Sequence, residues 1–81
     1  MDSPTKLVII HWMDSKGITS EWEFLDDLKA YVPAECTSVG YLLEDAPEYK
    51  TIVQSLGGSQ VMGRLSIPAA CIQEIKEVHS V

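Results

Sequence analysis

Apolar and polar positions alternate most regularly in the last third of the chain. Over residues 60–67, apolar residues or glycine occupy every second position, which is the period of a strand with one buried face. The alternation stops at Pro68, after which apolar residues recur at every third position: Ile72, Ile75 and Val78. This pattern predicts a strand, a tight 3₁₀ turn and a short closing strand. A single amphipathic helix over residues 69–79 fits the same spacing and remains an alternative.

Three more strands are predicted upstream. Residues 7–13 form a continuous apolar, β-branched run, which is typical of a strand covered on both faces. Residues 37–43 and 49–56 predict two further strands, joined by the acidic turn 44–48. Gly57-Gly58-Ser59 then predicts a hairpin turn into the strand at residues 60–67.

The pattern after the first strand is typical of a helix, the clearest one in the chain. It follows turn-forming residues 14–17, and Ser20 and Glu23 have the spacing of a capping box. Pro33 predicts that this helix ends near Val32. Helical spacing predicts an inward stripe, which would place Trp22 in the core. The residues of this stripe are Trp22, Leu25, Leu28 and Val32, with Phe24 beside it.

One helix beside a run of antiparallel strands predicts an α+β fold. We expect a single domain over residues 1–81, with residues 1–5 as a loose lead-in, because 81 residues leave no room for a second core. A short meander protects its edges best by curling into a small β-barrel of about five strands. A core of this size gives only marginal stability to a monomer. Because Met62 is also expected on the outward face, where an apolar side chain suits a contact between copies, we expect a homo-oligomer.

The charge balance is acidic. Twelve acidic residues against six basic ones give a net charge of −6, and the basic residues form no cluster. Nucleic-acid binding depends on clustered lysine and arginine, so this composition disfavours it. A small anion stays compatible with the sequence, because one arginine and a few backbone amides can hold it.

Candidate catalytic residues do not form a recognisable set. The two histidines, His11 and His79, have no visible partner, and Cys36 and Cys71 are expected to be buried, reduced thiols. No CxxC or HxxxH spacing indicates a metal site, and no glycine-rich loop precedes a helix. We therefore expect no enzymatic activity, no cofactor and no metal.

The distribution of apolar residues also bears on location. Only four apolar residues, 7–10, follow Lys6 before His11, which is too few for a secretory signal. No segment approaches the ~18 apolar residues of a membrane span. A cytoplasmic protein without membrane contact is expected.

Polar and aromatic residues near two turns are the candidate ligand-binding site. Trp12, Asp14, Ser15 and Trp22 bracket the turn after the first strand, where a tryptophan offers a flat surface for a planar ligand or a protein partner, so a binding role for Trp22 stays open beside its place in the core. Gln54, Ser55 and Arg64 flank the hairpin turn, and Arg64 is the only arginine in the chain. Its guanidinium could grip a phosphate or carboxylate with two donors. The alternatives are that Trp12 belongs to the core, Asp14 caps its turn and Arg64 is solvent-facing.

The same residues carry a resemblance that spans residues 7–78. Trp12-x-Asp14-Ser15, Trp22, residues 38–42, Tyr49, Gln54-Ser55 and the ending from Gly63 to Ile75 together resemble a family of small uncharacterised phage and prophage proteins. The ending, with Ile67-Pro68 followed by Ile72 and Ile75, also looks like the last strands and 3₁₀ turn of SH3-like and Sm-like barrels. The expected architecture is thus an SH3/Sm-like barrel with one helix after the first strand.

The resemblance implies a role in counter-defence inside the host cell. Some small phage proteins sequester a host nucleotide signal as compact oligomers, and others block a host protein. The first hypothesis is therefore sequestration of a small nucleotide-like ligand, and the alternative is an acidic inhibitor that binds a host protein. An Sm-like nucleic-acid binder is a third hypothesis, which the charge disfavours.

Overall fold

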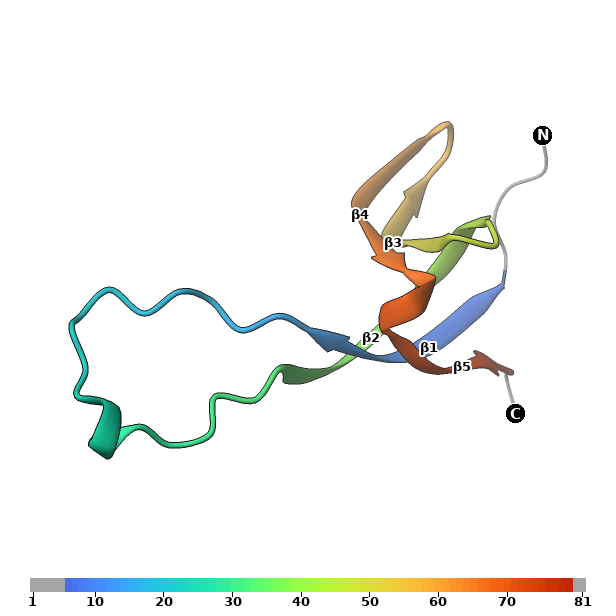
Figure 1. Cartoon of the computed structure of the whole chain (residues 1–81). Coiled ribbons are helices and arrows are strands. Elements are labelled where there is room, and N and C mark those ends of the chain that lie inside the picture. Colours follow the sequence, from blue (N-terminus) through green and yellow to red (C-terminus); the bar gives the residue numbers. More distant parts are fainter. Residues whose placement is uncertain (1–5, 80–81) are drawn as a thin grey trace.

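A single antiparallel β-sheet forms the body of the protein. The computed structural model describes residues 6–79, and its five strands lie in the order β4-β3-β2-β1-β5 (Figure 1). In chain order the elements are β1 (Leu7–Asp14), the 3₁₀ turn η1 (Leu25–Asp27), β2 (Ala34–Asp45), β3 (Tyr49–Gly57), β4 (Gln60–Pro68), the 3₁₀ turn η2 (Ala69–Cys71) and β5 (Ile72–Val78). The expected lead-in at residues 1–5 lies outside the described residues.

The fold is all-β, so the predicted α+β class is wrong. Residues 6–79 contain no α-helix, and the segment predicted as one has only η1. The capping box does not form, and the Glu23 carboxylate instead accepts a hydrogen bond from the Thr19 hydroxyl at 3.4 Å. An isolated helix of about a dozen residues is marginal in water. Here the predicted apolar stripe has no neighbouring element to pack against, since every residue from 15 to 33 is exposed.

The end of the chain follows the strand and turn interpretation, not the helical alternative. Pro68 has φ −58° and leads into η2, after which β5 begins at Ile72. The amide of Ala69 donates to the Glu48 carbonyl at 2.9 Å, which ties η2 to the start of β3. β5 then pairs antiparallel with β1 and forms the edge of the sheet opposite β4.

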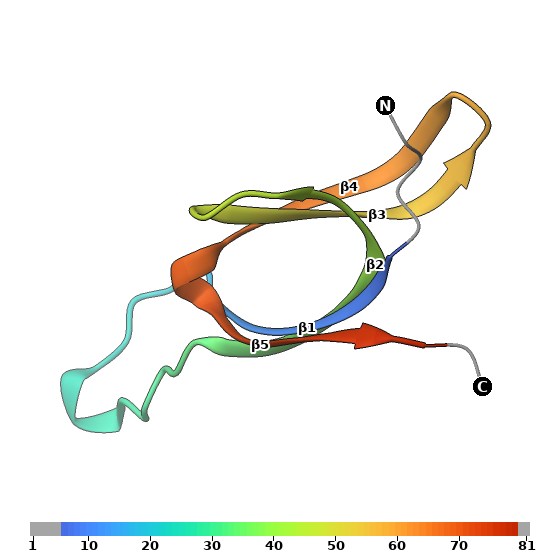
Figure 2. The same ribbon diagram turned by 90° about the vertical axis from the view of Figure 1, so that its right-hand side faces the viewer.

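The sheet is strongly curled but open. Figure 2 shows β1, β2 and β3 bending around a common centre, with η2 bridging from β4 to β5. β4 and β5 are the two edges of the sheet, so the expected barrel is not closed by strand pairing. Register shifts at residues 42–44 of β2, and between β1 and β5 at His11 and Trp12, supply local bends of the kind that β-bulges produce.

A small cluster inside the curl is the core. Val8 and Ile10 of β1 pack with Ile52 of β3 and Ile67 of β4. Gly40 of β2 lets β3 approach, because a Cβ atom there would lie only 2.8 Å from the carbonyl oxygen of Val53. Partly buried side chains complete the cluster: Trp12, Leu42, Cys71 and Ile72.

Two segments extend away from this core. Residues 15–33 form a long excursion between β1 and β2, here called the arm, and residues 54–66 form the outer part of the β3–β4 hairpin, here called the tip (Figure 1). The radius of gyration is 16.8 Å, whereas a compact chain of this length has about 12 Å. The longest dimension is 55 Å, so much of the chain lies outside the body of the fold.

Candidate functional site

Trp12, Asp14 and Ser15 lie where β1 leaves the body and the arm begins. Trp12 is half-buried against the core, and its indole N–H donates to the Ser38 hydroxyl at 3.0 Å. Asp14 is the last residue of β1, and its carboxylate accepts a hydrogen bond from the Ser15 amide at 2.9 Å. Trp12 is thus mainly structural, and Asp14 caps the turn that follows it.

Gln54, Ser55 and Arg64 lie together on the tip. Arg64 of β4 pairs with Val53 of β3, so it is next to Gln54 across the hairpin. All three candidate side chains are exposed. Within residues 6–79 no carboxylate lies within ion-pair distance of Arg64, so its guanidinium is free to bind an anion.

The sheet separates these two groups of residues. Trp12 pairs with Cys36 in β2, whereas β3 joins β2 only from Tyr41 onward, where Val53 is the partner. Tyr41 is five positions along β2 from Cys36, which corresponds to about 17 Å of strand. In both views the arm and the tip project from different sides of the body and point away from each other (Figures 1 and 2). The six candidate residues therefore form two surfaces and not one pocket.

The arm carries the feature that the sequence interpretation missed. Trp22, placed in the core by helical spacing, has a relative exposure of 104%, and Phe24 and Leu25 are 81% and 85% exposed. The remaining large apolar residues of the arm are also exposed: Ile18, Leu28, Tyr31 and Val32. Loops longer than about 12–15 residues without secondary structure of their own are uncommon, and they are usually either functional or linker segments. This concentration of exposed apolar side chains makes the arm a candidate interaction surface.

A few local contacts shape the arm. The Tyr31 hydroxyl donates to the Gly17 carbonyl at 2.7 Å, and the Lys16 ammonium lies 5.0 Å from the centre of the Tyr31 ring. These contacts join the two sides of the arm near its base. The far end turns through η1, where the Leu28 amide donates to the Leu25 carbonyl at 3.3 Å. The arm encloses a shallow hollow of about 660 Å³, whose lining includes Trp22, Phe24, Leu28 and Tyr31.

A second hollow lies on the body of the sheet. It has a volume of about 470 Å³ and is lined by His11, Glu35, Cys36, Thr37, Gln73 and Glu74. The His11 ring shares a hydrogen bond with the Thr37 hydroxyl at 3.1 Å. A hydrogen bond from Lys76, at 2.9 Å, lowers the pKa of Glu74. Two carboxylates in this hollow make it a poor site for a nucleotide or another anion.

Three features of residues 6–79 concern metal binding, thiol chemistry and helix length. In residues 6–79 no three histidine, cysteine or acidic residues are grouped to hold a metal ion. Both cysteines are free, as predicted, although they are half-buried and not fully enclosed. Among the same residues, no helix has the length and apolar character that crossing a membrane requires.

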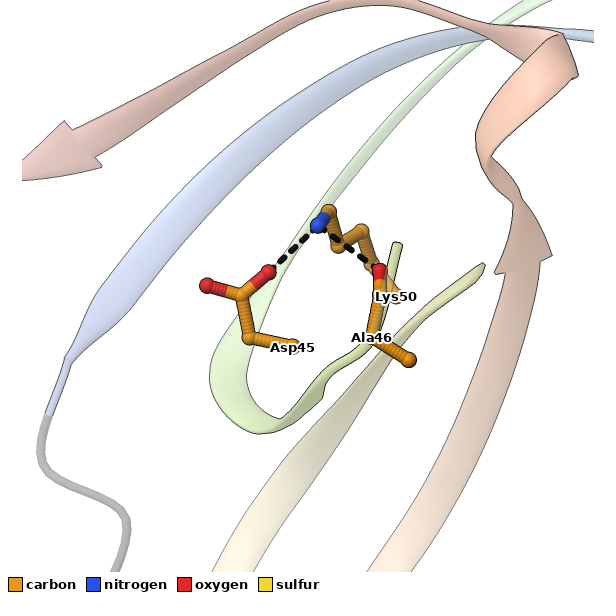
Figure 3. Close-up of polar contacts among 3 residues, drawn as sticks. All are labelled: Asp45, Ala46 and Lys50. Atoms are coloured by element: carbon orange, nitrogen blue, oxygen red, sulfur yellow. Dashed lines mark hydrogen bonds and ion pairs between the residues drawn. The ribbon is translucent and has the colours of Figure 1, made fainter. Parts of the chain in front are cut away.

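A polar network fixes the turn between β2 and β3. The Lys50 ammonium donates hydrogen bonds to the Asp45 carboxylate and, at 2.9 Å, to the Ala46 carbonyl (Figure 3). The contact with Lys50 holds the pKa of Asp45 below its ordinary value. In the same turn, the Tyr49 hydroxyl donates to the Glu44 carboxylate at 2.7 Å, which raises the pKa of Tyr49. These interactions stabilise the turn.

Comparison with known proteins adds no relative. The chain matches no protein-family model, and no similar curated protein or solved structure was found. The arm and the tip are therefore the two surfaces from which a function can be inferred.

Proposed function

We propose that this protein is a non-enzymatic binding protein that acts by contact between its arm and another protein. The observation that carries this proposal is the exposure of the arm's apolar side chains, which ranges from 51% at Leu28 to 104% at Trp22. Aromatic anchors of this kind dominate the energetics of protein interfaces. A segment so apolar is costly to keep in water, so a partner that covers it gains the hydrophobic free energy.

The charges of the arm indicate the chemistry of the partner. Two lysines against four acidic residues leave the arm at −2, and the whole chain carries −6. Acidic residues lie on both sides of the exposed aromatic residues: Glu21, Glu23, Asp26 and Asp27. An apolar surface with a basic rim complements this arrangement, and long-range attraction speeds the encounter of opposite charges. The proposal therefore corresponds to an acidic protein that binds and blocks a partner, such as a host protein if the chain is phage-encoded.

A photo-crosslinking amino acid in place of Trp22 tests this proposal. The same amino acid at Val39, an exposed apolar position of β2, is the matched control. We expect protein adducts at position 22 and not at position 39, after irradiation of the pure chain or of a cell extract. For adducts with other proteins of the cell extract, an excess of unlabelled wild-type chain should suppress them, and an excess of a Trp22→Ser, Phe24→Ser variant should not. Equal adducts at both positions, or equal competition by both chains, would contradict a specific role of the arm.

Arg64 favours a second candidate function, the binding of a small nucleotide-like anion. Its guanidinium is exposed on the tip beside Gln54 and Ser55, without a carboxylate partner in the described part of the chain. A free guanidinium is suited to a phosphate because it can donate two parallel hydrogen bonds. The resemblance to small phage proteins would place either activity in counter-defence. A thermal-shift screen against nucleotides tests this candidate, since a ligand at 100 times its Kd adds about 2.7 kcal/mol of stability.

A further inference from the structure

The tip is the second exposed apolar surface of the molecule. Every residue from 54 to 66 is exposed, although this segment belongs to two long strands. Met62 is 69% exposed, and three other apolar side chains accompany it: Leu56, Val61 and Leu65. The outer side of β4 also has no neighbouring strand, because β4 is an edge of the sheet. Natural edge strands are usually blunted by charge, and β4 carries only Arg64.

The arm and the tip are complementary in charge. Arg64 is the only charged residue of the tip, which gives this surface +1 in a chain of net charge −6. The arm carries −2, with its acidic residues next to its aromatic side chains. The chemistry required of the arm's partner, an apolar surface bearing positive charge, is therefore present in the protein itself. Methionine also packs favourably on aromatic rings, which suits Met62 to Trp22 or Phe24.

The two surfaces of one molecule cannot meet each other. The arm extends from the end of the sheet where β1 finishes and β2 begins, and in both views the tip projects from the far side of the curled body, away from the arm (Figures 1 and 2). The curled core lies between them, and the molecule is 55 Å long. A contact between an arm and a tip must therefore join two molecules.

We propose that the arm of one molecule docks on the tip of a second copy of this chain. This inference rests on the proposed function, that the arm binds protein, and it identifies the partner surface. Because the two patches differ, the contact is head to tail. Repetition of such a contact gives a closed ring if the rotation closes and an open filament if it does not. Each copy would cover the exposed apolar residues of its neighbour.

Complementation between two variants tests the proposal. The arm variant is Trp22→Ser, Phe24→Ser, and the tip variant is Met62→Ser, Arg64→Glu. All four side chains are exposed, so each variant should keep the fold, which circular dichroism would verify. Self-association of each variant alone should weaken by about 30-fold or more, the scale of an interface hot spot. In an equimolar mixture the intact arm of the tip variant can bind the intact tip of the arm variant. We expect this pair to form a species of twice the 9.0 kDa chain mass.

Sedimentation of the wild-type chain, both variants and their mixture at micromolar concentration gives distinct outcomes. A Val39→Thr variant, altered at an exposed position outside both surfaces, should associate like the wild type. The head-to-tail proposal is overturned if the wild type is monomeric, if either variant assembles like the wild type, or if the mixture stays monomeric. Should the tip variant alone retain assembly while the arm variant loses it, the arm binds protein at another surface, and the proposed function stands. Should the arm variant assemble normally and position 22 give no specific adducts, the proposed function fails as well.

Discussion

The backbone of Gly63 in β4 lies directly against the side chain of Gln54 in β3. A Cβ atom on Gly63 would come within 2.8 Å of the Gln54 Cβ, and the glycine has φ +77°. Both facts require a residue without a side chain, because L-residues rarely adopt this left-handed conformation. Arg64 follows immediately, so the strand conformation at Gly63 sets where its guanidinium is presented.

Gly63→Ala should lower the free energy of unfolding by about 1–3 kcal/mol, since it combines backbone strain with a steric collision. Denaturant unfolding of the two chains measures this difference. Gly57→Ala is the matched control in the same hairpin, because its nearest neighbour, the Gln60 carbonyl oxygen, would be 4.0 Å away and its φ is not positive. A loss at Gly57 as large as that at Gly63 would show that the hairpin tolerates no alanine at all.

Removal of the two tryptophan side chains should have very different effects on the free energy of unfolding. Trp12→Ala should cost about 2–4 kcal/mol of stability, because its ring packs on the core and its N–H donates to Ser38. In the isolated molecule Trp22→Ala should change stability by less than about 0.5 kcal/mol, since the side chain is fully exposed. Chemical denaturation below the concentration of assembly separates the two cases. A large loss of stability for Trp22→Ala in the monomer would contradict the finding that the Trp22 side chain is exposed on the arm.

Strand positions were predictable because their signals are local. The alternation over residues 60–67, the Gly57-Gly58-Ser59 turn and the break at Pro68 each report the conformation of neighbouring residues. The segment 20–32 shows where this approach fails. Its capping box and apolar spacing are also local signals, but a short helix needs tertiary packing to persist. The sequence does not reveal that no element covers the arm.

The candidate site was harder to predict than the strands. The sequence predicts turns at residues 14–17 and 57–59, and it places the polar residues beside them in one candidate site. Their separation follows from strand order and register, since β1 pairs with one half of β2 and β3 with the other. Register depends on pairing between distant segments, which a single sequence does not show. The signal for the arm was its large number of apolar residues. Because these residues also have helical spacing, the pattern predicts a buried helix face and not an exposed loop.

The turn between β2 and β3 predicts a specific pH dependence. The pKa of Asp45 should lie below its ordinary value in the folded chain, because Lys50 donates to its carboxylate. A lowered folded-state pKa gives stability that is present above the unfolded-state value and is lost as the pH falls through the folded one. A carbon-detected NMR titration of Asp45 measures this. Lys50→Met should return the midpoint toward the ordinary value, and an unchanged midpoint would exclude Lys50 as the cause.

Arg64 gives the sharpest test of the anion-binding candidate. For a planar anion identified by thermal shift, Arg64→Ala should weaken binding by about 1.5–3 kcal/mol, the scale of a charge-assisted hydrogen bond. Arg64→Lys should recover only part of this loss, because an ammonium cannot donate as a two-pronged fork. Stability should change by less than about 0.5 kcal/mol in both variants, since the side chain is exposed and makes no ion pair within residues 6–79. Calorimetry for the ligand and denaturation for the fold separate the two effects. If Arg64→Ala leaves the affinity unchanged, the anion binds elsewhere, and if it unfolds the chain, Arg64 is a structural residue.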